Sequence, residues 1–147
     1  MEQIGTVLDC IQICPPRHVQ LALYPLLPGL RSFIRETALA LEHRHQLFKS
    51  LLPKDWELGS QGGYYAFVKH PFRGVSSTDV CRKMATHFGV VTLPAAFFIP
   101  RQQLVEPHED DSERDQWIRF SIANVDDANI TMVCSRLNMI TNNFSRV

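Results

Sequence analysis

Near the end of the chain the sequence reads Trp117-Ile118-Arg119-Phe120-Ser121-Ile122-Ala123. Apolar side chains at every second position are typical of a β-strand with one buried face, because successive side chains of a strand point to opposite sides of the sheet. The alternation predicts that Ile118, Phe120 and Ile122 pack in the core. The residues between them, Arg119 included, are predicted to lie on the opposite face of the sheet.

Other segments carry the β-branched and aromatic residues that favour strands. They are Trp56–Leu58, Tyr64–Lys69, Val90–Leu93 and Phe97–Ile99. Between the first two stands Gly62-Gly63, which indicates a turn or a close approach of the backbone to another group. The polar and acidic residues 101–115 are predicted to form a surface loop.

Two helices with clear capping residues are expected in the second half of the chain. Ser76 or Ser77 is placed to cap a helix whose apolar residues recur every four positions, and Gly89 follows its predicted end. Asp126 is placed to cap the last helix. Its predicted apolar stripe consists of Ile130, Val133, Cys134, Leu137 and Met139 or Ile140.

The first part of the chain reads as helices separated by prolines. The predicted segments are 1–14, 17–28 and 29–52, and the last has the longest apolar stripe. Together these elements predict an α/β fold, close to α+β, in which a small mixed or antiparallel sheet packs against helices. A long N-terminal helical segment precedes the sheet.

Composition narrows the function classes. The chain has 147 residues, of which 45% are hydrophobic, with 15 basic and 15 acidic side chains and no net charge. A nucleic-acid-binding domain normally carries a basic excess, so we expect no nucleic-acid partner. We expect no membrane span either, since the apolar runs are far shorter than the roughly 18–20 residues that a span needs. No signal peptide is recognised.

Cysteine and histidine positions do not favour a metal site. The widely scattered cysteines suggest free thiols in a reducing compartment, the cytoplasm. Cys10, Cys14 and His18 are spaced four apart, but Pro15-Pro16 makes a shared helix face improbable. His43 and His45 are predicted to be surface residues.

Arg119 is the main candidate for chemistry. A guanidinium stays charged in proteins, and its planar fork suits bidentate recognition of a carboxylate or phosphate. From the residues alone, two readings stay open for this arginine. It either pairs with a protein carboxylate or solvent on the sheet face, or it binds the anionic group of a ligand.

Several segments in a fixed order resemble the C-terminal part of class I/II pyridoxal-phosphate aminotransferases. They are Asp9–Arg17, Gly62–Val68, Phe88–Phe98, Trp117–Ala123 and the terminal helix ending near Arg136-Leu137. The resemblance implies the fold-type-I small domain plus the long helix that connects it to the large domain. Residues 1–28 would then be a remnant of the large domain or interdomain segment, and residues 29–147 the small domain.

The resemblance implies roles for individual residues. Arg119 and Ser121 match an Arg-x-Ser motif whose arginine binds the α-carboxylate of the amino-acid substrate. Tyr65 matches an aromatic position on the substrate side of the cofactor pocket, with core packing as the alternative. Gly63 matches a place where the backbone passes closely, with an ordinary turn as the alternative. Ala95 stands where the family usually has glycine.

The resemblance also implies that this chain lacks catalytic residues. The full-length family uses pyridoxal phosphate bound to a lysine in a Ser-x-Ser-Lys segment, which is absent here. The lysines present are Lys49, Lys54, Lys69 and Lys83. We therefore expect no covalent cofactor on this chain and no transamination by it alone. In the full enzyme, a homodimer is expected, with an amino acid and a 2-oxo acid as substrates.

Two alternative functions remain at this stage. The chain could be a non-catalytic α/β module that binds a partner protein through apolar positions of residues 1–28. It could also be a fragment of a related pyridoxal-phosphate-dependent decarboxylase, synthase or lyase, since fold does not fix the reaction.

Overall fold

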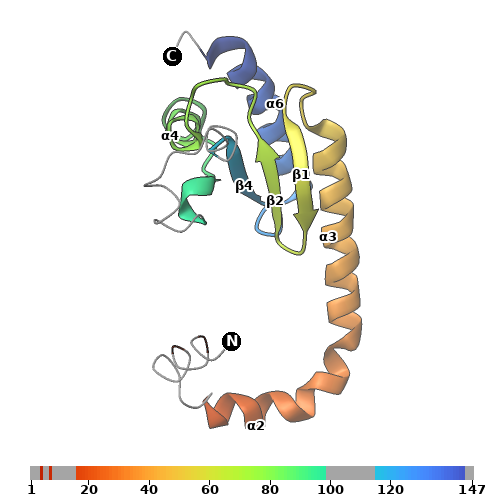
Figure 1. The fold of residues 1–147 in the computed structure, drawn as a ribbon. Coiled ribbons are helices and arrows are strands. Elements are labelled where there is room, and N and C mark those ends of the chain that lie inside the picture. Colours follow the sequence, from red (N-terminus) through yellow and green to blue (C-terminus); the bar gives the residue numbers. More distant parts are fainter. Residues whose placement is uncertain (1–3, 5–6, 8–15, 99–114, 145–147) are drawn as a thin grey trace. The chain divides into compact units, whose positions relative to one another are not determined.

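The computed structural model describes residues 16–98 and 115–144, together with Ile4 and Val7 (Figure 1). The chain divides into two compact units, Met1–Thr37 and Ala38–Val147. The long helix α3, Arg31–Leu51, belongs to both, because the division falls within it.

The first unit is helical where the structure describes it. It contains α2, Arg17–Leu26, a 3₁₀ turn η1, Leu27–Leu30, and the first turns of α3. No side chain of α2 or η1 is buried. The helix predicted over 17–28 corresponds to α2, which contains Pro25, and to the 3₁₀ turn η1 that follows it. The helix predicted over 1–14 lies outside the described residues except for the helical Ile4 and Val7, and Cys10 and Cys14 lie outside them too.

The second unit contains an antiparallel sheet of four strands and its covering helices. The strands are β1, Glu57–Gly62; β2, Tyr65–Lys69; β3, Leu93–Pro94; and β4, Trp117–Ser121. Their order across the sheet is β1-β2-β4-β3, and all neighbouring strands run antiparallel. The remaining elements are α4, Ser77–Phe88; a 3₁₀ turn η2, Ala95–Phe97; and α6, Asp127–Asn143. The predicted fold class is confirmed, and the sheet is antiparallel rather than mixed.

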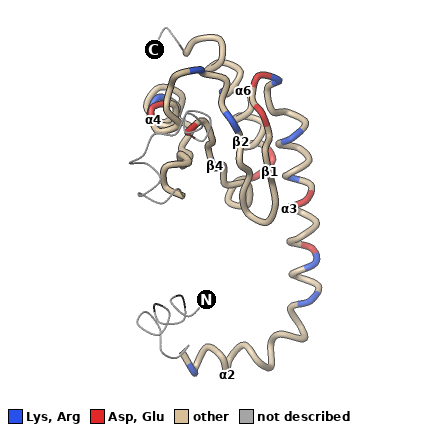
Figure 2. The backbone as a smooth tube through the Cα atoms, in the orientation of Figure 1, with Lys and Arg blue, Asp and Glu red and all other residues tan. Residues whose placement is uncertain are grey.

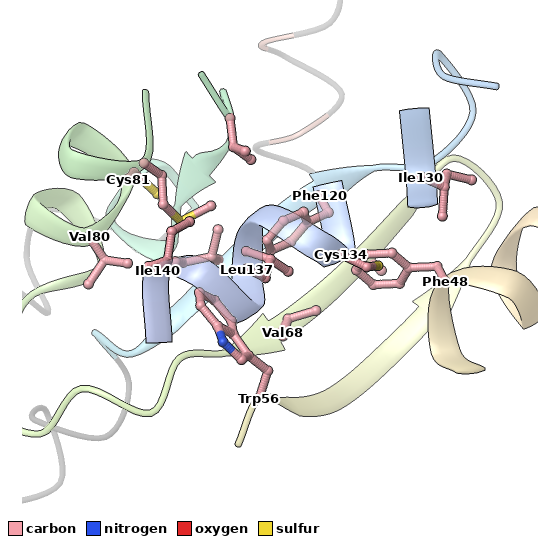
Figure 3. Packing of buried hydrophobic residues seen from close by; sticks show 14 of the residues in the cluster. Phe48, Trp56, Val68, Val80, Cys81, Phe120, Ile130, Cys134, Leu137 and Ile140 are labelled. Atoms are coloured by element: carbon pink, nitrogen blue, oxygen red, sulfur yellow. The ribbon is translucent and has the colours of Figure 1, made fainter. Parts of the chain in front are cut away.

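The core lies on one face of this sheet. Alternate strand residues, including Ala66, Val68 and Ile118, pack there against side chains from α4, α6 and the end of α3. The Phe48 ring of α3 contacts the Phe120 ring of β4, with centroids 5.6 Å apart. Figure 3 shows Cys134 and Leu137 of α6 beside these rings. Burial of this apolar surface supplies most of the stability of the unit.

The predicted helix caps are confirmed. The Ser76 hydroxyl accepts a hydrogen bond from the Asp79 N–H at 3.1 Å, and Gly89 ends α4 in the left-handed conformation at φ 62°. The Asp126 carboxylate accepts from the Asn129 N–H at 2.8 Å. Each cap satisfies backbone groups that the first or last helical turn leaves unpaired.

Two predicted strands differ from the structure. Of the segment Val90–Leu93, only Leu93 enters the sheet, followed by Pro94. The strand predicted at Phe97–Ile99 is wrong where the structure describes it. Residues Ala95–Phe97 form η2, closed by a hydrogen bond from the Phe98 N–H to the Ala95 carbonyl. Pro94 has no N–H for a ladder, so the chain turns away from the sheet at this point. The acidic segment 101–114 lies outside the described residues.

His45 also differs from its prediction. Its side chain is buried, and its Nε2 lies 3.0 Å from the Gly63 carbonyl oxygen, which ties α3 to the β1–β2 turn. His43 is exposed as predicted and lies 3.3 Å from the Asp127 carboxylate. The buried residues of α3 are His45 and Phe48, so the buried part of this helix is shorter than its apolar stripe and includes a histidine.

Candidate substrate-carboxylate site

Strand β4 separates the two sets of side chains that the sequence predicted. Ile118, Phe120 and Ile122 are buried in the core, whereas Arg119 is half-buried on the opposite face and Ser121 is exposed. Arg119 stands opposite Phe67 of β2 on one side and Leu93 of β3 on the other. We call this second surface of the sheet, which carries Tyr65, Phe67, Arg119 and Ser121, the open face.

Aromatic rings surround the guanidinium of Arg119. Its Cζ lies 4.1 Å from the centroid of the Tyr65 ring and 4.4 Å from that of Phe98. The Phe98 ring in turn packs edge-on against Phe67, with centroids 5.8 Å apart. Contacts of this kind are attractive, because the cation lies over the negative face of a π-system.

Protein carboxylates do not occupy this site among the described residues. The arginine–carboxylate pairs that the described part of the chain contains join Arg44 to Asp127 and Arg82 to Asp79. Ring contacts use no N–H donor, so they leave the fork of Arg119 able to accept a bidentate anion. Among the described residues, the guanidinium of Arg119 thus contacts aromatic rings and is paired with no carboxylate.

Tyr65 and Gly63 lie at the start of β2. The Tyr65 side chain is 39% exposed, so it is not a core residue, and its ring contacts Arg119.

Gly63 has a φ of 53°, and no described atom would lie within 4 Å of a Cβ placed on it. Within the described residues, Gly63 is therefore required by the left-handed turn between β1 and β2 rather than by a close approach. Ala95 does not need a positive φ, since positive φ is confined to glycines among the described residues.

A cavity of about 270 Å³ lies at the edge of the core, where Phe48, Val90 and Ile130 line it. Ser121 of β4 is part of its wall, together with Val91 and the Arg136 side chain. Arg136 donates a hydrogen bond to the Gly89 carbonyl at 3.0 Å, which fixes one end of this wall. The lining of this cavity includes Ser121 but not Arg119, so it is not the space in front of the guanidinium.

A larger cavity of about 490 Å³ is separate from these residues. Its lining includes Asp55, Lys69, His70 and Arg73. Burial lowers the pKa of His70 to about 4 against the opposing effect of Asp115. The His70 Nδ1 accepts a hydrogen bond from the Phe72 N–H at 3.2 Å, so this neutral imidazole holds the loop after β2.

The lysines present do not fit a covalent pyridoxal-phosphate site. Lys83 donates to the Phe144 carbonyl at 3.2 Å and lies over the Phe144 ring, away from Arg119. Lys49 and Lys54 are exposed at the end of α3 and after it, and Lys69 lines the separate larger cavity. Figure 2 shows basic and acidic positions interleaved along α3. The two side chains that contact the Arg119 guanidinium, Tyr65 and Phe98, carry no amine that could form a Schiff base.

Comparison with known proteins gives a family for most of the chain. A profile of the family Aminotransferase class I and II matches residues 13–137. The chain belongs to the class I and II aminotransferase family. No curated protein sequence matches the chain.

Two solved aminotransferase structures share the fold. One is YbdL from Escherichia coli, whose crystal structure and reactivity identify a methionine aminotransferase function; the TM-score is 0.66 at 16% identity over 94% of this chain. The other is a Psychrobacter arcticum 273-4 protein provisionally described as an amino-acid aminotransferase, with a TM-score of 0.59 at 17% identity over 97% of this chain. The chain spans 34% of the length of each.

The described part of the chain contains neither a metal-binding cluster nor a membrane-spanning helix. Residues 16–98 and 115–144 contain no group of three His, Cys, Asp or Glu side chains arranged to hold a metal ion. No helix among the described residues is long and apolar enough to cross a bilayer.

Phe98 is the residue at the site that the sequence did not indicate. It follows η2, whereas the sequence predicts a strand at Phe97–Ile99. That prediction does not indicate toward which residues the Phe98 ring points. The only signal available was the run of aromatic residues after Pro94, which by itself does not distinguish Phe98 from the more exposed Phe97.

Proposed function

We propose that this chain is the substrate-carboxylate-binding part of a pyridoxal-phosphate-dependent amino-acid aminotransferase. In this proposal Arg119 binds the α-carboxylate of an amino acid or 2-oxo acid, and Tyr65 lines the same site. The observation that carries it is the guanidinium of Arg119 on the open face, in contact with two rings and with no carboxylate partner among the described residues.

The proposal divides the work between this chain and a larger domain outside this sequence. Residues 1–28 would be interdomain or large-domain sequence and residues 29–147 the small domain. Pyridoxal phosphate, when bound to the larger domain, would supply the electron sink for transamination. The family membership and the 34% coverage of solved aminotransferases support this division. A cytoplasmic homodimer is the assembly that we propose for the complete enzyme.

Carboxylate binding by Arg119 can be measured directly. We expect the Nε–H resonance of Arg119 to shift saturably when a 2-oxo acid such as 2-oxobutyrate is added, at constant ionic strength. Arg119→Lys should weaken binding about tenfold or more, because a lysine keeps the charge and loses the bidentate fork. Arg82→Ala is the control, since Arg82 is exposed and pairs with Asp79. Equal binding by wild type and Arg119→Lys would contradict the proposed role.

Catalytic incompleteness has its own test. The chain is incubated with pyridoxal phosphate and reduced with borohydride. Mass spectrometry of Lys49, Lys54, Lys69 and Lys83 should then show only low, non-selective labelling. Stoichiometric labelling of one lysine would contradict the proposal that the Schiff-base lysine lies outside this chain.

One observation favours a second candidate, a partner-binding module without catalysis. Helix α2 exposes large apolar side chains, among them Leu21 and Tyr24, the latter 81% exposed. Such a surface marks an interface or an aggregation-prone region. Sedimentation that shows a monomer at every protein concentration, with no partner bound, would count against this candidate.

A further inference from the structure

The Phe98 ring contacts the guanidinium of Arg119, with Cζ 4.4 Å from the ring centroid. The ring follows η2, and the hydrogen bond from the Phe98 N–H to the Ala95 carbonyl, 2.8 Å long, sets the direction in which the chain leaves that turn. The ring is 44% exposed, so it is not part of the hydrophobic core. Its contacts are the Phe67 ring and the Arg119 guanidinium.

The two rings that contact Arg119 come from different parts of the second unit. Tyr65 belongs to β2, whereas Phe98 follows β3, and these strands flank β4 on its two sides. A long arginine side chain loses rotamer entropy when it is fixed in one orientation. Two ring contacts remove part of this freedom before any ligand arrives, which lowers the entropic cost of binding.

A ring is a suitable support for a carboxylate-binding arginine. A protein carboxylate would hold the guanidinium equally well, but it would occupy the N–H donors that the ligand needs. Phe98 has no polar atom, and the guanidinium of Arg119 lies over the face of its ring, so the ring supplies no acceptor that competes with a ligand carboxylate. Edge-on packing on Phe67 keeps the Phe98 ring in place.

We propose that Phe98 is a positioning residue for the carboxylate site: its ring orients the Arg119 guanidinium on the open face and thereby sets the affinity for the substrate carboxylate. This inference rests on the proposed function of Arg119. It assigns a specific task to a residue that makes no polar contact with the ligand.

The neighbouring phenylalanine offers a matched control. Phe97 belongs to η2 and is 72% exposed, and its ring makes no contact with another ring or cation among the described residues. Phe98→Leu and Phe97→Leu therefore remove the same chemical group one position apart. Phe98→Tyr retains the ring and serves as the conservative rescue.

The first measurement concerns the free chain. The Nε–H resonance of Arg119 is assigned as the one that is lost in Arg119→Lys. It should carry a ring-current shift, because two rings contact the guanidinium. We expect Phe98→Leu to reduce this shift, and Phe97→Leu and Phe98→Tyr to leave it unchanged. An unchanged Arg119 resonance in Phe98→Leu would overturn the inference. Phe98→Met, which fills a similar volume without a ring, replaces Phe98→Leu if the latter does not fold.

The second measurement is the titration with 2-oxobutyrate at constant ionic strength. Phe98→Leu should raise the dissociation constant about 3- to 10-fold, with wild-type affinity in Phe98→Tyr and Phe97→Leu. Equal affinity of Phe98→Leu and wild type would overturn the inference. If the wild type binds no 2-oxobutyrate while Phe98→Leu still alters the Arg119 resonance, the proposed function fails and the orienting contact of Phe98 stands.

Discussion

The two faces of the four-stranded sheet are built from the same strands and have different physical roles. The core face carries Val68, Ile118 and Phe120, which are buried under α4, α6 and the end of α3. The open face carries Tyr65, Phe67 and Arg119, which remain half-buried or exposed. Burial of the core face supplies stability, and the open face holds the chemistry that we assign to the chain.

This difference teaches how alternation along a strand separates stability from binding. Ile118 and Arg119 are adjacent in sequence, yet Ile118 is completely buried, whereas Arg119 is half-buried and contacts the rings of Tyr65 and Phe98. Substitutions on the two faces should therefore change different observables. The core face should control the free energy of unfolding, and the open face should control ligand affinity.

The largest effect is expected on the core face at Phe120. Phe120→Ala removes a buried ring that contacts Phe48 at 5.6 Å, and it should lower the free energy of unfolding by about 3–5 kcal/mol through cavity formation. Urea denaturation measures this loss. Phe120→Leu, which keeps most of the volume, should lose clearly less. A cost under about 1 kcal/mol for the alanine variant would show that the core face does not control stability.

A pH dependence is expected where the core face ends, at His70. Burial lowers the pKa of this imidazole in the folded chain from 6.5 to about 4, so the unfolded chain binds the extra proton first as pH falls. The contribution of neutral His70 to the free energy of unfolding is complete above pH 6.5 and is lost as pH decreases toward 4. The loss is on the order of 1–3 kcal/mol.

Comparison of two histidine variants isolates this contribution. His70→Asn can still accept the Phe72 N–H and should remove the additional slope of unfolding free energy with pH. His43→Asn, a change at an exposed residue, should retain it. An unchanged slope in His70→Asn would show that His70 is protonated in the folded chain as easily as in the unfolded one.

A smaller effect is expected at the β1 end of the open face. A Cβ on Gly59 would overlap the Trp117 ring, so Gly59→Ala should cost about 1–3 kcal/mol through overpacking. Gly62→Ala in the same strand is the control, because no described atom beyond its chain neighbours lies within 4 Å of its added Cβ. Thermal or urea unfolding of the two variants gives the comparison. Equal stability of both variants would mean that the Trp117 ring does not cover this part of the face.

The smallest effect on stability is expected at Arg119. Arg119→Ala loses two partly exposed cation–π contacts, so its unfolding free energy should fall by no more than about 1 kcal/mol. Carboxylate binding should be lost in the same variant. A stability loss above roughly 3 kcal/mol would instead indicate a buried ion pair and would place Arg119 with the residues of the core face.

The fold was largely predictable because local signals agree in this chain. The alternation from Ile118 to Ile122 predicted which side of β4 is buried, and Ser76 and Asp126 marked the helix starts by capping chemistry. The prediction failed at Phe97 because a 3₁₀ turn and a short strand have similar apolar content over three residues. His45 was misjudged because its partner, the Gly63 carbonyl, is supplied by the tertiary fold.

The site was predictable only in part. Arg119 could be identified by its charge within an apolar strand, and Tyr65 through the family resemblance. Phe98 could not, since its contact with Arg119 depends on how η2 leaves the sheet. Residues that act through a ring contact have no charge pattern that would reveal them in a sequence.

The edges of the sheet have a consequence for self-association. β3 at one edge has two residues, and one of them, Pro94, offers no N–H to an incoming strand. β1 at the other edge has a register irregularity between Leu58 and Ser60. Short, proline-containing or bulged edges are poor templates for strand addition. Copies of this chain should therefore not add strand to strand at these edges into amyloid-like ribbons.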